Sequence, residues 1–73
     1  MEREMQLLDV VALIEDMPAE SLVRGQVGTV VEELDEGTVL VEFADPSGRS
    51  YAITPVPVDR LLRLRYEPWE PST

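Results

Sequence analysis

The chain has 73 residues and a net charge of -9, with fifteen acidic residues against six arginines and no lysine, histidine or cysteine. A chain of this length forms one small domain with a thin core, so a deep substrate cavity is not expected. The missing residue types also remove the commonest general base, the thiolate ligand of metal sites and the amine of Schiff bases. We therefore expect a non-enzymatic protein without a metal or a cofactor.

Hydrophobic residues make up 44% of the sequence and charged residues 29%, as in a folded soluble domain. The longest apolar run, Val10 to Ile14, is too short to cross a membrane. Residues 1–6 alternate charges instead of leading into the apolar segment of a signal peptide. We expect these residues to be a flexible N-terminus, and the protein to be cytoplasmic and without membrane contact.

The first predicted strand is Val10 to Ile14, because this run is rich in β-branched residues and too short for a stable helix. The next stretch, MPAESLVRG, starts near a proline and ends on a glycine, which predicts a long surface connection. Such loops carry function more often than strands do. Within it we choose three candidate contact residues, of which the arginine is expected to be free for recognition: Ser21, Leu22 and Arg24.

Two valine-rich runs, Val27 to Leu34 and Thr38 to Phe43, predict a β-hairpin. Residues 35–37 join them as a three-residue turn in which Gly37 supplies the left-handed conformation. Alternate residues of the second run share one face, which we expect to point into the core. They are Val39, Val41 and Phe43.

An acidic cluster surrounds this turn and comprises Glu32, Glu33, Asp35 and Glu36. It lacks the ligand spacing of a calcium loop, and a pair of carboxylates would need a cleft to act as acid and base. A solvated, mutually repelling tip is the simplest interpretation. The functional alternative is a contact surface for a basic partner, with Glu33, Asp35 and Glu36 as candidate contact residues.

Residues 45–48, DPSG, predict a type I turn that leads into a fourth strand, RSYAIT. Pro55 and Pro57 cannot donate ladder hydrogen bonds, so PVPVDRL is predicted to leave the strand as a bend or one tight helical turn. LLRLRY, residues 61–66, resumes strand alternation.

Leucines occur on both faces of this last predicted strand, and four apolar residues are assigned to the side away from the core: Val11, Leu13, Leu40 and Leu61. Small domains often cover such residues by self-association, so a homo-oligomer is one expectation. Arg60, Arg63 and Arg65 are expected to pair across strands with carboxylates such as Asp9 or Glu15, in preference to an anion or RNA contact.

These elements predict an all-β fold: a single small SH3-like barrel of five antiparallel strands, spanning residues 7–68, with one short helical turn before the last strand. Residues 69–73 form a proline-rich tail with the sole tryptophan, Trp69. Its ring either caps the barrel or anchors in a partner, and the sequence leaves both open.

The stretch ESLVRGQVGTVVEEL followed by GTVLVEF resembles the KOW-type SH3-like barrel, with Gly25, Gly28 and Val30 at the motif positions. The two glycines favour a bulge or tight start of the second strand over a phosphate loop. The span from LLDVVAL to LLRLRYEP is similar to a family of short uncharacterised bacterial proteins, a domain of unknown function. That resemblance implies the barrel and no activity, although a neighbouring toxin-like protein would imply an antitoxin role.

The expected function is therefore an acidic protein–protein interaction module without catalytic residues, which binds a basic surface of another protein. An antitoxin or regulatory partner of a neighbouring protein is its concrete form. The net negative field repels phosphate backbones, so free nucleic acid is not an expected ligand. The alternative is a KOW-like RNA- or ribosome-associated domain that uses Arg24 and Arg49 with Tyr51.

Overall fold

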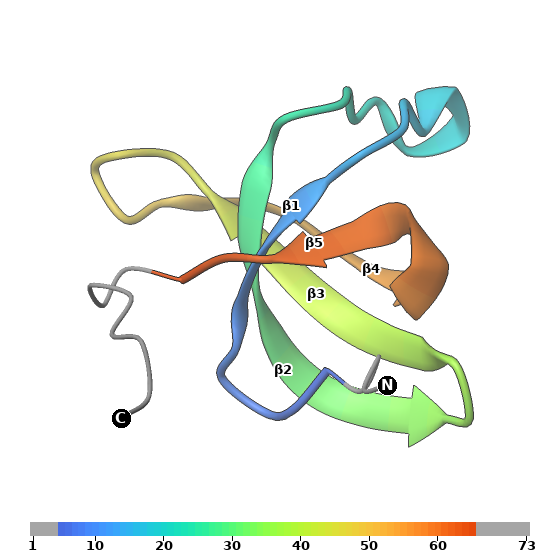
Figure 1. Cartoon of the computed structure of the whole chain (residues 1–73). Helices are drawn as coiled ribbons and strands as arrows, with labels where there is room; N and C mark the ends of the chain where they lie inside the picture. Colours follow the sequence, from blue (N-terminus) through green and yellow to red (C-terminus); the bar gives the residue numbers. More distant parts are fainter. Residues whose placement is uncertain (1–4, 66–73) are drawn as a thin grey trace, which may run out of the picture.

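The computed structural model describes residues 5–65, which form one open antiparallel sheet of five strands in the order β4-β3-β2-β1-β5 (Figure 1). The strands are β1 Val10–Leu13, β2 Val27–Asp35, β3 Thr38–Ala44, β4 Ser50–Pro57 and β5 Leu61–Arg63. Two 3-10 turns are present in the described residues, η1 Pro18–Glu20 and η2 Val58–Arg60. The all-β class, the five antiparallel strands and the helical turn before the last strand are confirmed. No helical segment within residues 5–65 has the length and apolar character needed to span a membrane.

The core is built from alternate residues of the strands. Its ten apolar members are Val11, Leu13, Met17, Leu22, Val30, Val39, Val41, Phe43, Val56 and Leu61. Phe43, the largest of them, is fully buried. The predicted inward face of β3 is therefore confirmed, because its three residues all belong to this core.

The predicted faces of the first and last strands are wrong. Val11, Leu13 and Leu61 are buried, whereas Leu62 is 55% exposed. Leu13 lies opposite Leu61 in the β1–β5 ladder, so these side chains point to the same side of the sheet. Since leucines occupy both alternating sets in this segment, apolar periodicity could not identify the buried set. Leu40 does face away from the core and is half-buried.

The prolines of β4 do not end this strand, which continues through both of them to Pro57. The N–H of Val58 donates to the carbonyl oxygen of Gly37 at 2.8 Å, so alternate residues such as Val56 turn their N–H groups toward β3. The nitrogens of Pro55 and Pro57 then face the free edge. The prediction failed because β4 is an edge strand, where proline is tolerated and blocks further pairing.

The predicted turn at residues 45–48 is confirmed by a 2.8 Å hydrogen bond from the N–H of Gly48 to the carbonyl oxygen of Asp45. The Asp45 carboxylate organises the turn. Its Oδ1 accepts hydrogen bonds from the Ser47 hydroxyl at 2.7 Å and from the N–H groups of Ser47 and Arg49 at 3.0 Å each. These bonds favour the charged form.

The hydroxyl of Ser47, followed by the N–H of Arg49, holds the pKa of Asp45 below its ordinary value of 3.8. A folded-state pKa below the unfolded value means that ionised Asp45 adds stability above the unfolded pKa, and that this stability disappears as the pH falls through the folded pKa. We expect Ser47→Ala to raise the pKa of Asp45 toward the ordinary value, measured by NMR titration. Ser50→Ala serves as the control and should leave this pKa unchanged.

Candidate functional site

The hairpin of β2 and β3 ends in an exposed acidic tip, defined here as residues 32–37. A two-residue turn, Glu36 and Gly37, closes it, one residue shorter than predicted because Asp35 already pairs with Thr38. Gly37 has a φ of 88°, which confirms its predicted left-handed conformation. Every residue of the acidic tip is exposed.

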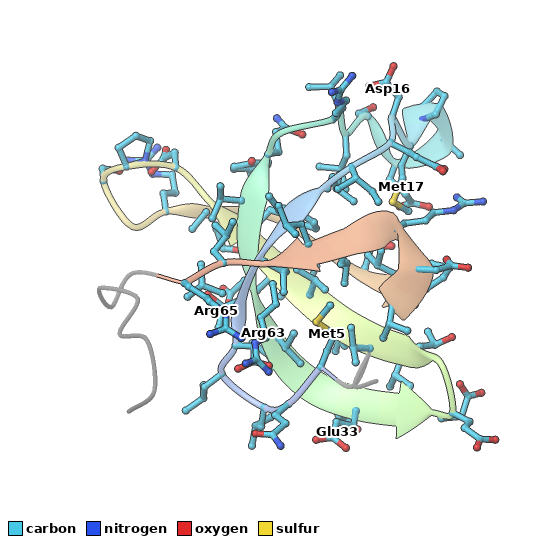
Figure 2. The ribbon with its side chains drawn as sticks, in the orientation of Figure 1. Met5, Asp16, Met17, Glu33, Arg63 and Arg65 are labelled. Atoms are coloured by element: carbon cyan, nitrogen blue, oxygen red, sulfur yellow. The ribbon has the colours of Figure 1, made fainter. Side chains whose placement is uncertain are left out.

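Two irregularities in the β2–β3 ladder shape this tip. The register shifts between Val30 and Glu32 and again between Glu33 and Asp35. Each shift leaves one residue of β2 unpaired, and at the second shift this residue is Leu34. Such bulges bend and twist a strand. Leu34 is consequently 43% exposed, with carboxylates on both sides of it along the chain. In Figure 2 the side chain of Glu33 extends outward from this end of β2.

The carboxylates of the acidic tip are not neutralised by ion pairs within residues 5–65. The ion pairs in this part of the chain join Arg60 Nε to Glu15 Oε1 at 3.5 Å and Arg63 Nη1 to Asp9 Oδ2 at 3.9 Å. The predicted cross-strand pairing of Arg60 and Arg63 is thereby confirmed. The acidic tip thus concentrates negative charge at one end of the sheet.

The described residues contain no group of three or more acidic side chains arranged to hold a metal ion. The exposed carboxylates of the acidic tip attract positively charged groups in solution.

The long loop between β1 and β2 differs from the prediction at Leu22. This residue is 1% exposed and belongs to the core, so it is not available as a contact residue. Reciprocal backbone hydrogen bonds of 2.8 and 3.1 Å join Met17 and Leu22, and they fold the loop back so that both side chains are buried. The loop therefore closes one end of the core.

Ser21 and Arg24 are exposed on this loop, as predicted for contact residues. Ser21 has a left-handed backbone with a φ of 60°. The N–H of Arg24 donates to Asp16 Oδ1 at 2.8 Å, which fixes the backbone beside its side chain. These bonds make the loop a braced segment that presents Ser21 and Arg24 to solvent.

The structure does not bring the loop residues and the acidic tip together. The loop precedes β2 and the acidic tip lies at the far end of this strand, so residues 27–31 of β2 separate them. Five extended residues span about 17 Å. Ser21 and Arg24 therefore belong to a different surface from Glu33, Asp35 and Glu36. Trp69, the remaining candidate, lies outside the described residues.

Arg49 and Tyr51 lie near the end of the sheet that carries the long loop. Tyr51 is 48% exposed, and its ring centroid is 6.4 Å from that of Phe43. The N–H of Arg49 is held by Asp45. These residues offer one cation and one aromatic ring to solvent, in a chain dominated by carboxylates.

Leu34 is the residue of the acidic tip that sequence reasoning missed as a candidate. The signal was present in VVEELDEG, where one leucine interrupts a run of acidic residues. Period-two alternation gave no reason to expect it outside the core, because the two bulges that reorient it are not visible in the pattern.

A family model described as a domain of unknown function, DUF4926, matches residues 7–63, and the chain belongs to this family. The predicted relationship to a domain of unknown function is thus confirmed. Neither the curated proteins nor the solved structures contain a match to the chain.

Proposed function

We propose that this member of the DUF4926 family is a non-enzymatic protein-binding module whose acidic tip contacts a basic surface of another protein. The observation that carries the proposal is Leu34, an exposed apolar side chain among four carboxylates that have no ion-pair partner within residues 5–65. An apolar anchor inside a polar rim is the usual composition of a protein contact.

The charge of the chain supports a protein partner over a nucleic acid. With a net charge of -9, the protein attracts basic surfaces and accelerates their encounter, whereas it repels phosphate backbones. In its concrete form, the proposal is that the partner is a protein encoded by a neighbouring gene. The functional site of that protein is basic, and the acidic tip covers it. The chain would then act as an antitoxin or regulatory subunit.

The proposal includes a finer description of the fold, an SH3-like barrel of KOW type. Two observations support it. The chain passes through η2 and returns to pair β5 with β1, next to β2. Gly25, Gly28 and Val30 stand at the start of β2, where Gly25 has a φ of 94° and Gly28 is buried.

The partner can be sought by capture from a nuclease-treated extract of the source cells. The bait is the wild-type chain, compared with Asp35→Asn/Glu36→Gln, which removes two charges from the acidic tip. Glu20→Gln/Asp59→Asn removes two exposed charges elsewhere and is the matched control. We expect one basic protein to be retained by the wild type and by the control, and to be reduced by about tenfold on the tip variant, since ~1.4 kcal/mol of lost binding corresponds to that factor.

Equal retention by all three baits would contradict the role of the acidic tip. Retention only without nuclease treatment would show that RNA mediates the contact and would favour the ribosome-associated alternative.

A further inference from the structure

The side of β1 that faces away from the core carries a second surface, named here the outer apolar patch. β1 lies between β2 and β5 (Figure 1). Ala12 is directly opposite Val27 of β2 and Leu62 of β5. The N–H of Leu64 donates to the carbonyl oxygen of Val10 at 2.8 Å, which sets these two residues in the next row. The patch consists of Val10, Ala12, Ile14, Val27, Leu62 and Leu64.

The outer apolar patch is partly open to solvent. Leu62 is 55% exposed, and Ile14 and Val27 are each 44% exposed. A contiguous apolar sheet face in contact with water is unfavourable, and on small domains such a face commonly marks an interface. The patch lies across β5 and β1, whereas the acidic tip is the far end of the β2–β3 hairpin, so the two surfaces are distinct.

We propose that a second copy of this chain covers the outer apolar patch, with the two sheets packed face to face about a two-fold axis. The absence of charge on the six patch residues favours a second copy of the chain over a basic partner. The six residues of the patch are uncharged in a chain of net charge -9, so two copies meeting there place no carboxylates of the patch against each other. A basic partner would gain no ion pair from these six residues.

The rim of the patch also suits a second copy. Arg60 lies beside Ile14, because the N–H of Ile14 donates to the Arg60 carbonyl oxygen at 3.0 Å. The guanidinium of Arg60 pairs with Glu15 at 3.5 Å. The rim thus offers both signs of charge, and an isologous contact brings the arginine of each copy toward the glutamate of the other.

The sizes of the side chains in the patch also suit a second copy. Ala12, the smallest side chain, lies at its centre between the larger Val27 and Leu62. A two-fold arrangement lets the projecting Leu62 of each copy pack over Ala12 of the other, and both apolar surfaces leave water.

The size of the patch makes a weak dimer. A standard interface covers ~800 Å² on each partner, about a seventh of the 5560 Å² accessible surface of this chain, and the six side chains of the patch supply less than that. Salt should strengthen the dimer, because it screens the repulsion between two acidic copies. A complex made through the acidic tip should instead weaken with salt, so the failure of one proposal is distinguishable from the failure of the other.

Sedimentation equilibrium of the full chain tests the proposal over ~10 µM to ~1 mM, a range suited to interfaces below ~1,200 Å². We expect the wild type to dimerise reversibly and Leu62→Glu to raise the dissociation constant by at least ~30-fold, as for a central contact residue. Ile53→Glu is the matched control, since Ile53 is 57% exposed on β4, and it should dimerise like the wild type.

Leu62→Thr keeps strand propensity and should weaken the dimer in the same direction, which guards against a folding defect of the glutamate variant. A wild type that stays monomeric to ~1 mM would overturn the proposal. Equal effects of Leu62→Glu and Ile53→Glu, both folded by circular dichroism, would also overturn it.

Discussion

Gly28→Ala is expected to lower the free energy of unfolding by about 3 kcal/mol, the upper part of the range for overpacked cores. A Cβ at this position would lie 2.6 Å from Val41 Cγ1, 2.8 Å from the Glu42 carbonyl oxygen and 3.0 Å from Phe43 Cδ2. The carbonyl belongs to the neighbouring strand, so it cannot move without disturbing the β2–β3 ladder. Domains of this size have a total stability of about 3 to 5 kcal/mol, so the variant should retain at most about 2 kcal/mol of it.

Urea denaturation followed by circular dichroism measures this effect, with Gly25→Ala as the control. Gly25 has a φ of 94° and open space around the position of a Cβ, so its replacement costs only backbone strain. That strain is about 1 to 2 kcal/mol. A Gly28 variant no less stable than the Gly25 variant would contradict the close approach of β2 and β3.

Leu22→Ala is expected to cost about 3 kcal/mol, within the range for buried leucines. Leu22 is 1% exposed and closes the core from the long loop. Val23→Ala is the matched control, because Val23 is the next residue and is 54% exposed. We expect this control to change the stability by no more than about 0.5 kcal/mol.

Thermal unfolding of both variants distinguishes a structural role of Leu22 from a contact role. Equal melting temperatures for Leu22→Ala and the wild type would show that this side chain does not support the core. If the melting temperature falls as expected, any loss of partner binding by Leu22→Ala follows from unfolding and is no sign of a contact.

Local patterns predicted the buried face of a strand where only one set of alternate residues is wholly apolar. In β3, Val39, Val41 and Phe43 form such a set, whereas the other set contains Thr38 and Glu42, so the buried face was identified correctly. In the last strand both sets contain leucine, and the choice depended on the pairing of Leu61 with Leu13, which is not local information. The same limit explains β4, since Pro55 and Pro57 are acceptable because no strand within residues 5–65 pairs with its outer side.

The candidate site also has one part that the sequence predicted and other parts that depend on the folded structure. Composition alone located the acidic tip, because four carboxylates within five residues repel one another and remain in water. The burial of Leu22 could not be read from a loop assignment, since it depends on the pairing of Met17 with Leu22. The exposure of Leu34 depends on two bulges, which change the direction of side chains without changing the sequence pattern.

The arrangement of these parts agrees with the proposed role as a binding module. The core and the braced loop hold one end of the sheet, while the β2–β3 hairpin carries its charges and one leucine away from them (Figure 1). The proposed self-association surface uses β1, β5 and the start of β2, and it leaves the acidic tip accessible in both copies.

The central claim is that the acidic tip binds a basic protein, and calorimetric titration of the purified captured partner tests it most directly. We expect Asp35→Asn/Glu36→Gln to weaken binding by about tenfold, a loss of ~1.4 kcal/mol. Binding of the wild type should also weaken between ~0.1 M and ~1 M salt, as the Debye length falls from about 10 Å to about 3 Å. An affinity that is the same for both chains and insensitive to salt would contradict the claim.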